Sequence, residues 1–335
     1  MIDLSPFEQA IKYIPSRVRM QIVGLPPSIK NEVQEVRIRI GRAPSICIKG
    51  REYDISEFAQ VQNIVIDSSD INECFNYICE YSFHSYQQEL MQSYITVKGG
   101  HRVGISASAI IKSGGVETIK DISGLNIRIA RQVLGSADNI MKESLASGPK
   151  GLLLVGPPTC GKTTILRDIC RQLGGIYKLS IIDERGEIAA VYRGEPQNDI
   201  GRFSDVFDGY PKPIGILTAI RVMSPQVIVC DEIGNEDECK ELMSSVNSGV
   251  NIIASAHAGS VDELYKRKHI MKLIECGVFT EIILLDSGAN IGRIKSRIKV
   301  VTHNDKNNRN KLDYTSGNID RDFTFIEIEQ ESARA

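Results

Sequence analysis

The sequence has no long apolar run, no CxxC pair, no large excess of charge of one sign and no internal repeat. The apolar runs at residues 152–155 and 282–285 are far shorter than the ~18 residues that a membrane-spanning helix needs. The residues after Met1 also lack the basic and then apolar pattern of a secretory signal. The eight cysteines lie mostly within apolar segments, as reduced core thiols do. These absences predict a cytoplasmic protein.

Length and composition are typical of a globular protein. The 335 residues correspond to about two domains, and 42% hydrophobic residues are enough for a packed core in each. Disordered, collagen-like and miniprotein classes are therefore excluded. The 40 basic and 42 acidic residues leave a net charge of −2, so the overall charge gives no attraction to nucleic acid or anionic lipid. Any such binding would need a local patch.

The first part of the chain, residues 1–127, contains short segments typical of strands, with glycine pairs that mark turns. Between these segments, Ser69 and Asp70 precede a stretch that runs to Leu90 with apolar residues at helical spacing. We therefore predict a small N-terminal α+β domain. Its expected strands are 33–40, 45–49, 94–97 and 102–109.

Residues 128–335 follow a different pattern, in which an apolar strand leads through a turn into a helix and then into another strand. This alternation favours an α/β domain with a parallel sheet and helices on both faces. We expect helices at 163–173, which ends before Gly174, and at 237–247, which ends near Gly249. The expected strands are 152–155, 179–183, 227–230, 251–256 and 280–285.

Near the end of the chain, basic residues alternate with less polar ones at the period of a half-exposed strand. The basic residues are Arg293, Lys295, Arg297 and Lys299. A second predicted strand, 323–329, carries Glu327 and Glu329, and we interpret the two as edge strands that pair opposite charges. The alternative is a nucleic-acid patch, although residues 291–311 contain no Phe, Tyr or Trp on which bases could stack.

The strongest motif is GxxxxGK[ST], a phosphate-binding loop at residues 156–163. It follows the apolar strand at 152–155 and opens a predicted helix, which is the context that this loop requires. Its glycines let backbone N–H groups face phosphate, Lys162 adds a positive charge, and the hydroxyl of Thr163 can bind Mg²⁺. The motif therefore predicts ATP and Mg²⁺ as ligands. The expected nucleotide-binding residues are Gly156, Pro157, Pro158, Thr159, Cys160, Gly161, Lys162, Thr163 and Thr164.

A second apolar strand, 227–230, is followed by Asp231 and Glu232. These positions suit a carboxylate that holds Mg²⁺, Asp231, and one that polarises the attacking water, Glu232. The alternative is an acidic cap at a strand end. With the phosphate-binding loop upstream, the pair predicts nucleotide hydrolysis, with Lys162 and Glu232 as catalytic residues and Thr163 and Asp231 as metal ligands.

Four further residues each have a functional and a structural interpretation. Asp183 and Glu184 come at the end of an apolar strand, where they would lie near the γ-phosphate or form a solvated turn. His257 also ends a strand, where it would sense the γ-phosphate or make a capping hydrogen bond. Cys160 is either a reactive thiol beside a helix N-terminus and Lys162 or a small spacer in the loop.

In combination, these residues resemble the secretion ATPases of type II and type IV systems and, more narrowly, the stage III sporulation AA family. The resemblance implies a RecA-like P-loop NTPase core with a smaller N-terminal α+β domain. It also implies an Asp box at Asp183, Glu184 and Glu187, and a His box at His257. The segments that carry it are 35–44, 101–105, 125–131, 156–163, 183–185, 223–225, 231–234 and 255–257.

The same resemblance implies N-terminal arginines that reach the γ-phosphate, with Arg102, Arg128 and Arg131 as candidates. It further implies a homo-hexameric motor that integral membrane channel proteins of a sporulation complex recruit to the membrane. The tetracysteine zinc module of type II assembly ATPases is missing from the sequence, which argues against a pilus motor. We expect no direct nucleic-acid partner. Two alternatives stay open: a nucleic-acid-dependent RecA-like ATPase, and a structural subunit that hydrolyses nucleotide slowly or not at all.

Overall fold

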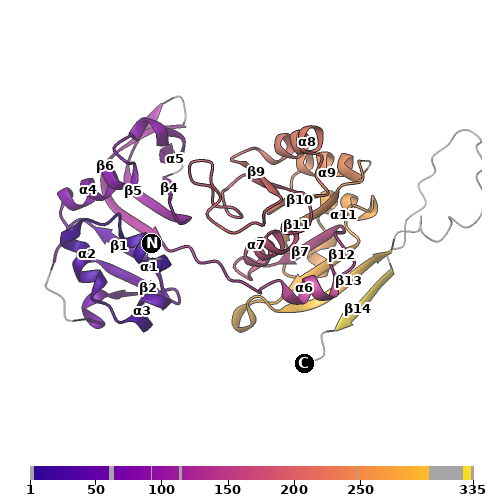
Figure 1. Ribbon diagram of the computed structural model, residues 1–335, viewed down its shortest axis with the longest axis horizontal. Coiled ribbons are helices and arrows are strands. Elements are labelled where there is room, and N and C mark those ends of the chain that lie inside the picture. The colour runs from indigo at the N-terminus through magenta and orange to yellow at the C-terminus, as the bar shows by residue number, and fades with distance from the viewer. Residues whose placement is uncertain are drawn as a thin grey trace, which may run out of the picture. The chain divides into compact units, whose positions relative to one another are not determined.

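The computed structural model describes residues 4–59, 64–91, 93–112, 115–246, 248–301 and 327–332, and it forms two compact units (Figure 1). The first unit comprises Met1–Gln132 and Ala190–Gln197, and the second comprises Val133–Ala189 and Asn198–Ala335. The sequence suggested a division after residue 127. The first unit extends a few residues further because Ile129 donates a backbone hydrogen bond to Gln34, which prolongs the pairing of the last strand of this unit.

The first unit contains a six-stranded antiparallel sheet with the order β3-β2-β1-β6-β5-β4. On β1, Val36 and Ile38 are fully buried whereas Arg37 and Arg39 are partly exposed, so alternate side chains face the core and the polar side. The strands are β1 (Val33–Arg39), β2 (Ser45–Ile48), β3 (Arg51–Asp54), β4 (Tyr94–Val97), β5 (His101–Lys112) and β6 (Gly115–Arg128).

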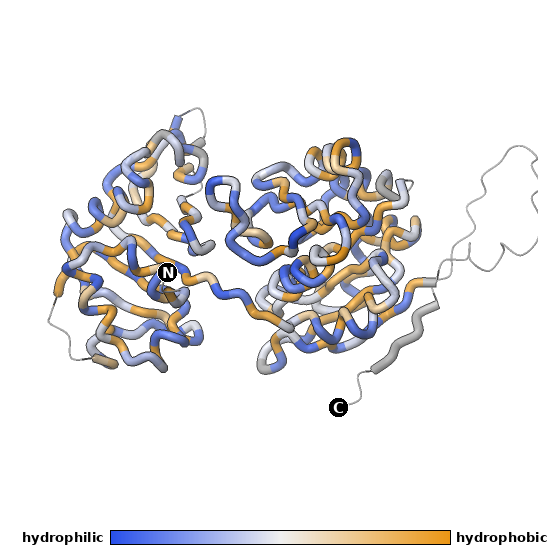
Figure 2. Tube along the Cα trace, in the orientation of Figure 1, coloured by the Kyte–Doolittle hydropathy of each residue, from blue (hydrophilic) through white to orange (hydrophobic). Residues whose placement is uncertain are grey.

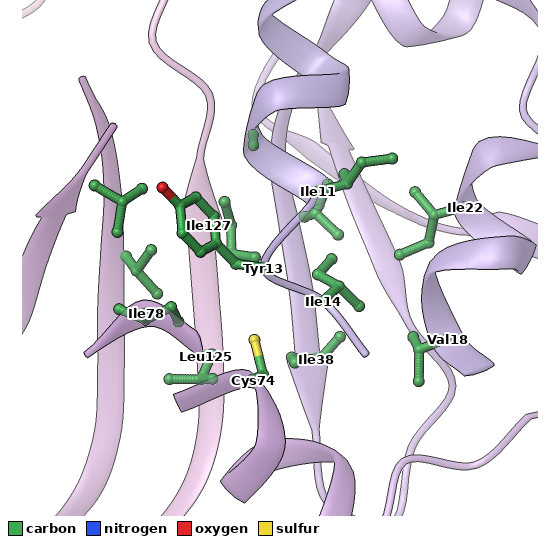
Figure 3. Close-up of a cluster of buried hydrophobic side chains, with 14 of the residues drawn as sticks. Ile11, Tyr13, Ile14, Val18, Ile22, Ile38, Cys74, Ile78, Leu125 and Ile127 are labelled. Carbon is green, nitrogen blue, oxygen red and sulfur yellow. The ribbon is translucent and has the colours of Figure 1, made fainter. Parts of the chain in front are cut away.

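Helices cover the apolar face of this sheet. Figure 3 shows Ile11 and Val18 of the N-terminal helices, and Ile14 from the connection between them, in one buried cluster with Ile38 and Ile127 of the strands. Capping boxes fix two helix starts, one at Ser5 with Glu8 and one at Asp67 with Asp70. The helices are α1 (Pro6–Ile11), α2 (Ser16–Val23), α3 (Pro27–Glu32), α4 (Ser68–Ile78) and α5 (Gln87–Met91).

The continuous helix expected up to Leu90 is wrong. Helix α4 ends at Ile78, because Glu80 and Tyr81 adopt positive φ values of 46° and 60° that no α-helix accommodates. A short 3₁₀ turn, Phe83–Tyr86, then leads into α5.

The second unit is built on an eight-stranded sheet with the order β14-β13-β12-β7-β11-β10-β8-β9. The six strands from β12 to β9 are parallel, and β13 and β14 are antiparallel. This arrangement confirms the predicted α/β class with a parallel sheet. The strands are β7 (Leu152–Gly156), β8 (Leu179–Asp183), β9 (Ser204–Asp208), β10 (Val227–Cys230), β11 (Asn251–His257), β12 (Glu281–Leu285), β13 (Ile294–Val301) and β14 (Glu327–Ser332).

Helices of the second unit lie on both faces of its sheet. Buried residues of α8, α9, α10 and α11 form one cluster with the strands, whereas α7 packs against β7 and β11 outside that cluster. Figure 2 shows apolar residues gathered along the strands inside each unit. The helices are α6 (Asp138–Glu143), α7 (Lys162–Leu173), α8 (Lys212–Met223), α9 (Glu236–Val246), α10 (Val261–Tyr265) and α11 (Lys268–Glu275). No helix within the described ranges is both long and apolar enough to cross a membrane.

The two strands at the end of the chain pair as expected. In the register of β13 and β14, Arg297 lies opposite Glu331 and Lys299 lies opposite Glu329. The prediction that these strands are neighbours with opposite charges in register is therefore confirmed, but of the two only β14 is an edge strand, because β13 also pairs with β12. The expected second strand began earlier, at residues 323–326, which lie outside the described residues.

A short segment of the second half of the sequence belongs to the first unit. We call Ala190–Gln197 the tongue. Its Tyr192 and Glu195 exchange backbone hydrogen bonds of 2.9 and 3.0 Å, which folds it into a narrow turn. The side chains of Tyr192 and Arg193 contact Glu80, and Gln197 accepts a 2.7 Å hydrogen bond from the backbone of Gly99.

Candidate nucleotide site

The register of the parallel strands brings the predicted residues to one edge of the second sheet. Gly156 at the end of β7 lies beside His257 of β11, and Cys230 at the end of β10 lies between Ile182 and Ala254. The residues that follow, Asp183, Asp231 and Ser255, therefore share this edge. Ligand sites in open α/β sheets form at the carboxyl ends of the strands, as they do here.

The loop between β7 and α7 has the tight backbone that its motif predicts. Thr159 and Gly161 both have positive φ, 62° and 99°, so the chain curls before the helix begins at Lys162. Gly156 has no room for a side chain, because a Cβ atom there would lie 2.5 Å from the sulfur of Cys160. Backbone N–H groups in such a turn form a concave site for an anion.

Lys162 is buried and lies across its own loop. Its Nζ donates hydrogen bonds to the carbonyl oxygens of Gly156 at 2.9 Å and Pro157 at 2.8 Å, and it lies 3.1 Å from Nδ1 of His257. These contacts hold the ammonium group at the mouth of the loop, where a phosphate would meet it.

Thr163 and Asp231 lie within direct contact of each other. The Thr163 hydroxyl donates a 2.7 Å hydrogen bond to Asp231 Oδ2, while Asp231 Oδ1 accepts hydrogen bonds from the Ser255 hydroxyl and from the backbone of Glu232. A hydroxyl and a carboxylate are hard oxygen ligands, which suit Mg²⁺ together with phosphate oxygens and water. The donor set therefore fits the predicted metal. Among the described residues, no three or more His, Cys, Asp or Glu side chains gather into a metal-binding group.

Glu232 has an unusual backbone that is held from several sides. Its φ is +51°, which costs roughly 1–2 kcal/mol in a non-glycine residue. Its N–H donates to Asp231 Oδ1 at 3.0 Å and to Ser255 Oγ at 2.9 Å. The surrounding groups therefore determine a conformation that the residue alone would avoid.

The carboxylate of Glu232 lies between His257 and Arg185, each at 2.7 Å. Burial alone would raise the pKa of Glu232, but the hydrogen bond from His257 and the charges of Arg185 and Lys162 outweigh it, so its pKa lies below the ordinary value. An ammonium group can only donate, so Nδ1 of His257 accepts from Lys162 and Nε2 carries the proton toward Glu232. His257 thus joins the loop lysine to the candidate base.

The predicted Asp box divides into two structural roles. Asp183 is 2% exposed, and its carboxylate accepts hydrogen bonds from the backbone N–H groups of Glu187, Ile188 and Ala189 at 2.7, 3.0 and 2.8 Å. Glu184 instead makes a 3.2 Å ion pair with Lys212. Asp183 therefore organises the turn after β8, and Glu184 lines a small pocket shared with Lys212, Asp231 and Glu232.

The candidate arginines of the first unit have different surroundings. Arg131 donates to the carbonyl oxygens of Val33 and Lys30 at 2.6 and 3.0 Å, and burial lowers its pKa. Arg102 lies over the ring of Tyr94 at 5.4 Å. The side chain of Arg128 is 64% exposed and lies 3.5 Å from Glu35. Arg131 thus supports its own domain, and the γ-phosphate role of all three stays a prediction.

Cys160 is 1% exposed, with its sulfur tucked against Gly156 and 3.9 Å from Lys162 Nζ. This burial favours the interpretation as a small spacer, because a reactive thiol must be reached by its reagent.

The sequence matches the family described as "Sporulation stage III, protein AA" over residues 8–301. The chain belongs to this family. A Bacillus subtilis member, stage III sporulation protein AA, is 34% identical over 287 residues, which cover 84% of this chain and 91% of the relative. The plant protein SEEDLING PLASTID DEVELOPMENT 1 of Arabidopsis thaliana is 30% identical over 182 residues, 53% of this chain and 26% of that protein.

Solved structures confirm the fold expected for the stage III AA family. The Legionella pneumophila ATPase DotB has a TM-score of 0.52 and 15% identity, covering 91% of this chain and 79% of DotB. The pilus retraction motor PilT with bound ADP has a TM-score of 0.54 and 14% identity, covering 85% of this chain and 78% of PilT. At this identity the likeness shows the fold: a RecA-like NTPase core with a smaller N-terminal domain.

Sequence reasoning assigned no role to three of the site residues, although two of them lie in segments that carry the family resemblance. They are Arg185, Lys212 and Ser255, which contact Glu232 or Asp231. Ser255 interrupts the apolar run of β11, which was an available signal. Lys212 stands between two prolines in the sequence, but nothing in that pattern reveals its burial.

Proposed function

We propose that this chain binds ATP with Mg²⁺ and hydrolyses it. The observation that carries the proposal is the direct hydrogen bond between Thr163, at the start of the loop helix, and Asp231, at the end of the neighbouring motif strand. The bond brings the two motifs together, with Lys162 and Glu232 joined through His257 beside it. The structural match to PilT, which covers 85% of this chain, supports a nucleotide as ligand, because the PilT structure holds ADP.

The roles of the residues follow from their chemistry. The loop N–H groups and Lys162 bind the phosphates, and Thr163 and Asp231 hold Mg²⁺, which when bound neutralises phosphate charge. The pKa of Glu232 lies below its ordinary value, so its carboxylate stays ionised at neutral pH despite partial burial. An ionised carboxylate accepts a hydrogen bond from water and orients it for attack in line with the leaving group. His257 fixes the direction of that carboxylate through Nε2.

The test is ATP turnover with purified full-length protein and variants. Lys162→Ala should weaken ATP binding and abolish hydrolysis, because it removes the charge at the mouth of the loop. Glu232→Gln should keep ATP binding and lower kcat by roughly 10²–10⁴-fold, the usual contribution of a general base. Glu236→Gln, an exposed glutamate at the start of α9, is the matched control and should leave both unchanged. Wild-type kcat in the Glu232 variant would remove this residue from the mechanism.

We further propose that the chain works as a homo-hexamer in a sporulation complex, energising a channel between mother cell and forespore. The family membership and the fold of DotB and PilT support a motor of this kind. Integral membrane channel proteins are the expected partners, and they would recruit a cytoplasmic ATPase to the membrane. Cosedimentation with vesicles that carry a partner's cytoplasmic domain tests this recruitment, and mass photometry with ATP tests the ring.

A nucleic-acid-dependent ATPase is the competing function. It would require a basic surface, but the basic strand β13 pairs in register with the glutamates of β14. We expect RNA and single-stranded DNA to leave turnover unchanged. Saturable stimulation by either at physiological salt, with affinity that falls steeply as salt rises, would favour the competing function.

A further inference from the structure

Lys212 is a buried cation beside the candidate site. It is the first residue of α8, and its side chain is 7% exposed. Its Nζ lies 3.2 Å from the carboxylate of Glu184 and 3.4 Å from that of Glu238, and it donates a 3.1 Å hydrogen bond to the carbonyl oxygen of Glu232. One ammonium group thus joins the turn after β8, the residue after Asp231 and helix α9.

The charge of Lys212 is retained in this setting. Burial alone would lower the pKa of the ammonium group, but the carboxylates of Glu238 and Glu184 outweigh it, so the pKa lies above the ordinary value. A buried ammonium between two carboxylates is expensive to replace by a neutral group, because the carboxylates then lose their partner.

The contacts of Lys212 converge on the backbone of Glu232. The N–H of Glu232 is held by Asp231 and Ser255, and its carbonyl is held by Lys212, so both sides of a residue with φ +51° are fixed. Glu238 extends this support, because its other oxygen accepts from the backbone of Gly234 at 2.9 Å. Lys212 therefore holds the carbonyl of Glu232, and its ion-pair partner Glu238 holds the backbone of Gly234, two residues further on.

We propose that Lys212 is a positioning residue for hydrolysis, which aims the Glu232 carboxylate by holding its peptide carbonyl and which holds Glu184 toward the same pocket. The inference rests on the proposed ATPase function. Lys212 touches neither phosphate nor water in this role; it acts through Glu232. Its loss should therefore lower kcat far more than ATP affinity.

A matched control distinguishes positioning from plain stabilisation. Lys150 makes a 2.6 Å ion pair with Glu281, which is 4% exposed, within the same unit. Glu281 pairs in register with Leu152, at the beginning of β7, whereas the site lies at the end of that strand. Lys150→Met therefore removes one cationic partner of a buried carboxylate, as Lys212→Met does, but at the opposite edge of the sheet, where Arg297 stays 3.4 Å from Glu281.

The experiment compares kcat, KM, the affinity for a non-hydrolysable ATP analogue and the unfolding midpoint of full-length variants. Lys212→Met should lower kcat by roughly 10–100-fold with nearly unchanged analogue affinity, as expected for loss of an interaction that supports the transition state. Lys150→Met should lower the unfolding midpoint but leave kcat unchanged. Lys212→Arg, which keeps the charge and the donor, should recover most of the activity.

A double variant keeps the proposal falsifiable if Lys212→Met folds poorly. Lys212→Met with Glu238→Gln removes the unpaired buried charge and should regain stability, yet kcat should stay low because the Glu232 carbonyl still lacks its donor. Wild-type kcat in this double variant, or an equal loss of kcat in Lys150→Met, would overturn the positioning role alone. Absence of turnover in the wild-type protein would overturn the ATPase proposal and this role with it.

Discussion

Substitution of Asp183 by Asn should loosen the turn after β8 without changing its shape. The carboxylate accepts three backbone N–H groups, with Oδ1 bonded to Glu187 and Oδ2 bonded to Ile188 and Ala189. An amide of the same size supplies only one oxygen. In its better orientation the amide keeps two of the three bonds and places its own N–H groups against the N–H of Glu187.

The size of the effect follows from these bonds. A hydrogen bond to a charged group contributes about 1.5–3 kcal/mol, and a buried donor left without a partner costs a similar amount. One lost bond and two weakened ones therefore amount to about 3 kcal/mol of local stability. At about 1.4 kcal/mol for each factor of ten, local opening of the turn should become roughly 100-fold more frequent.

Hydrogen exchange measured by mass spectrometry follows this opening directly. Peptides that contain Glu187, Ile188 and Ala189 should exchange roughly 100-fold faster in Asp183→Asn. Asp205→Asn, which changes an exposed residue of the adjacent strand β9, is the control and should exchange like the wild type. Unchanged exchange together with lost ATP turnover would refute this reasoning and favour a direct role of Asp183 at the γ-phosphate.

Three other predictions concern separate regions. Burial, with Lys12 and Arg131 nearby, lowers the pKa of His101 from 6.5 to about 4, so the stability of the first unit should be complete above pH 6.5 and should fall as the pH drops toward 4. The free energy of unfolding should fall by at most about 3 kcal/mol. His101→Asn keeps an acceptor for the backbone N–H of Ala130, and its urea unfolding should depend less on pH in this range than that of the wild type. Cys276 is exposed and the other seven cysteines are buried, so a thiol reagent should label one site quickly. Cys276→Ser should abolish that labelling. Fast labelling of Cys160 that ATP prevents would restore the reactive-thiol interpretation. Thr163→Ala should raise the Mg²⁺ concentration for half-maximal turnover roughly tenfold while Thr163→Ser does not, and equal requirements would exclude the hydroxyl from the metal site.

The sequence predicted most of the parallel sheet because each of its central strands is a short apolar run beside a turn. The same logic placed the phosphate-binding loop and Asp231, since a parallel register necessarily brings strand ends to one edge. Strand β9 was missed because Ser204–Asp208 lies at the sheet edge and alternates with polar residues, which weakens the apolar signal. The predicted helix up to Leu90 was too long, because positive φ values at Glu80 and Tyr81 end the helix although the apolar pattern continues.

Side-chain partners were harder to predict than motifs. Lys212 is 20 residues from Glu232 in sequence and 26 from Glu238, and only the packing of α8 against α9 and the strands brings the three together. Asp183 looked like a ligand-facing carboxylate because it ends a strand, but the following residues turn back so that their N–H groups reach it. Such pairings depend on the path of a loop, which no periodicity encodes.

The tongue has a consequence for dissecting or recombining this protein. Because Ala190–Gln197 belongs to the first unit, the polypeptide passes between the units at three places: after Gln132, after Ala189 and after Gln197. A fragment that ends at residue 132 would lack the tongue residues that contact Glu80 and Gly99. A fragment that starts at residue 133 would contain the tongue but not the two residues that it contacts. A chimaera between homologues would therefore have to exchange both segments together, and compensating changes should couple the tongue to the β4–β5 turn across some hundred residues of sequence.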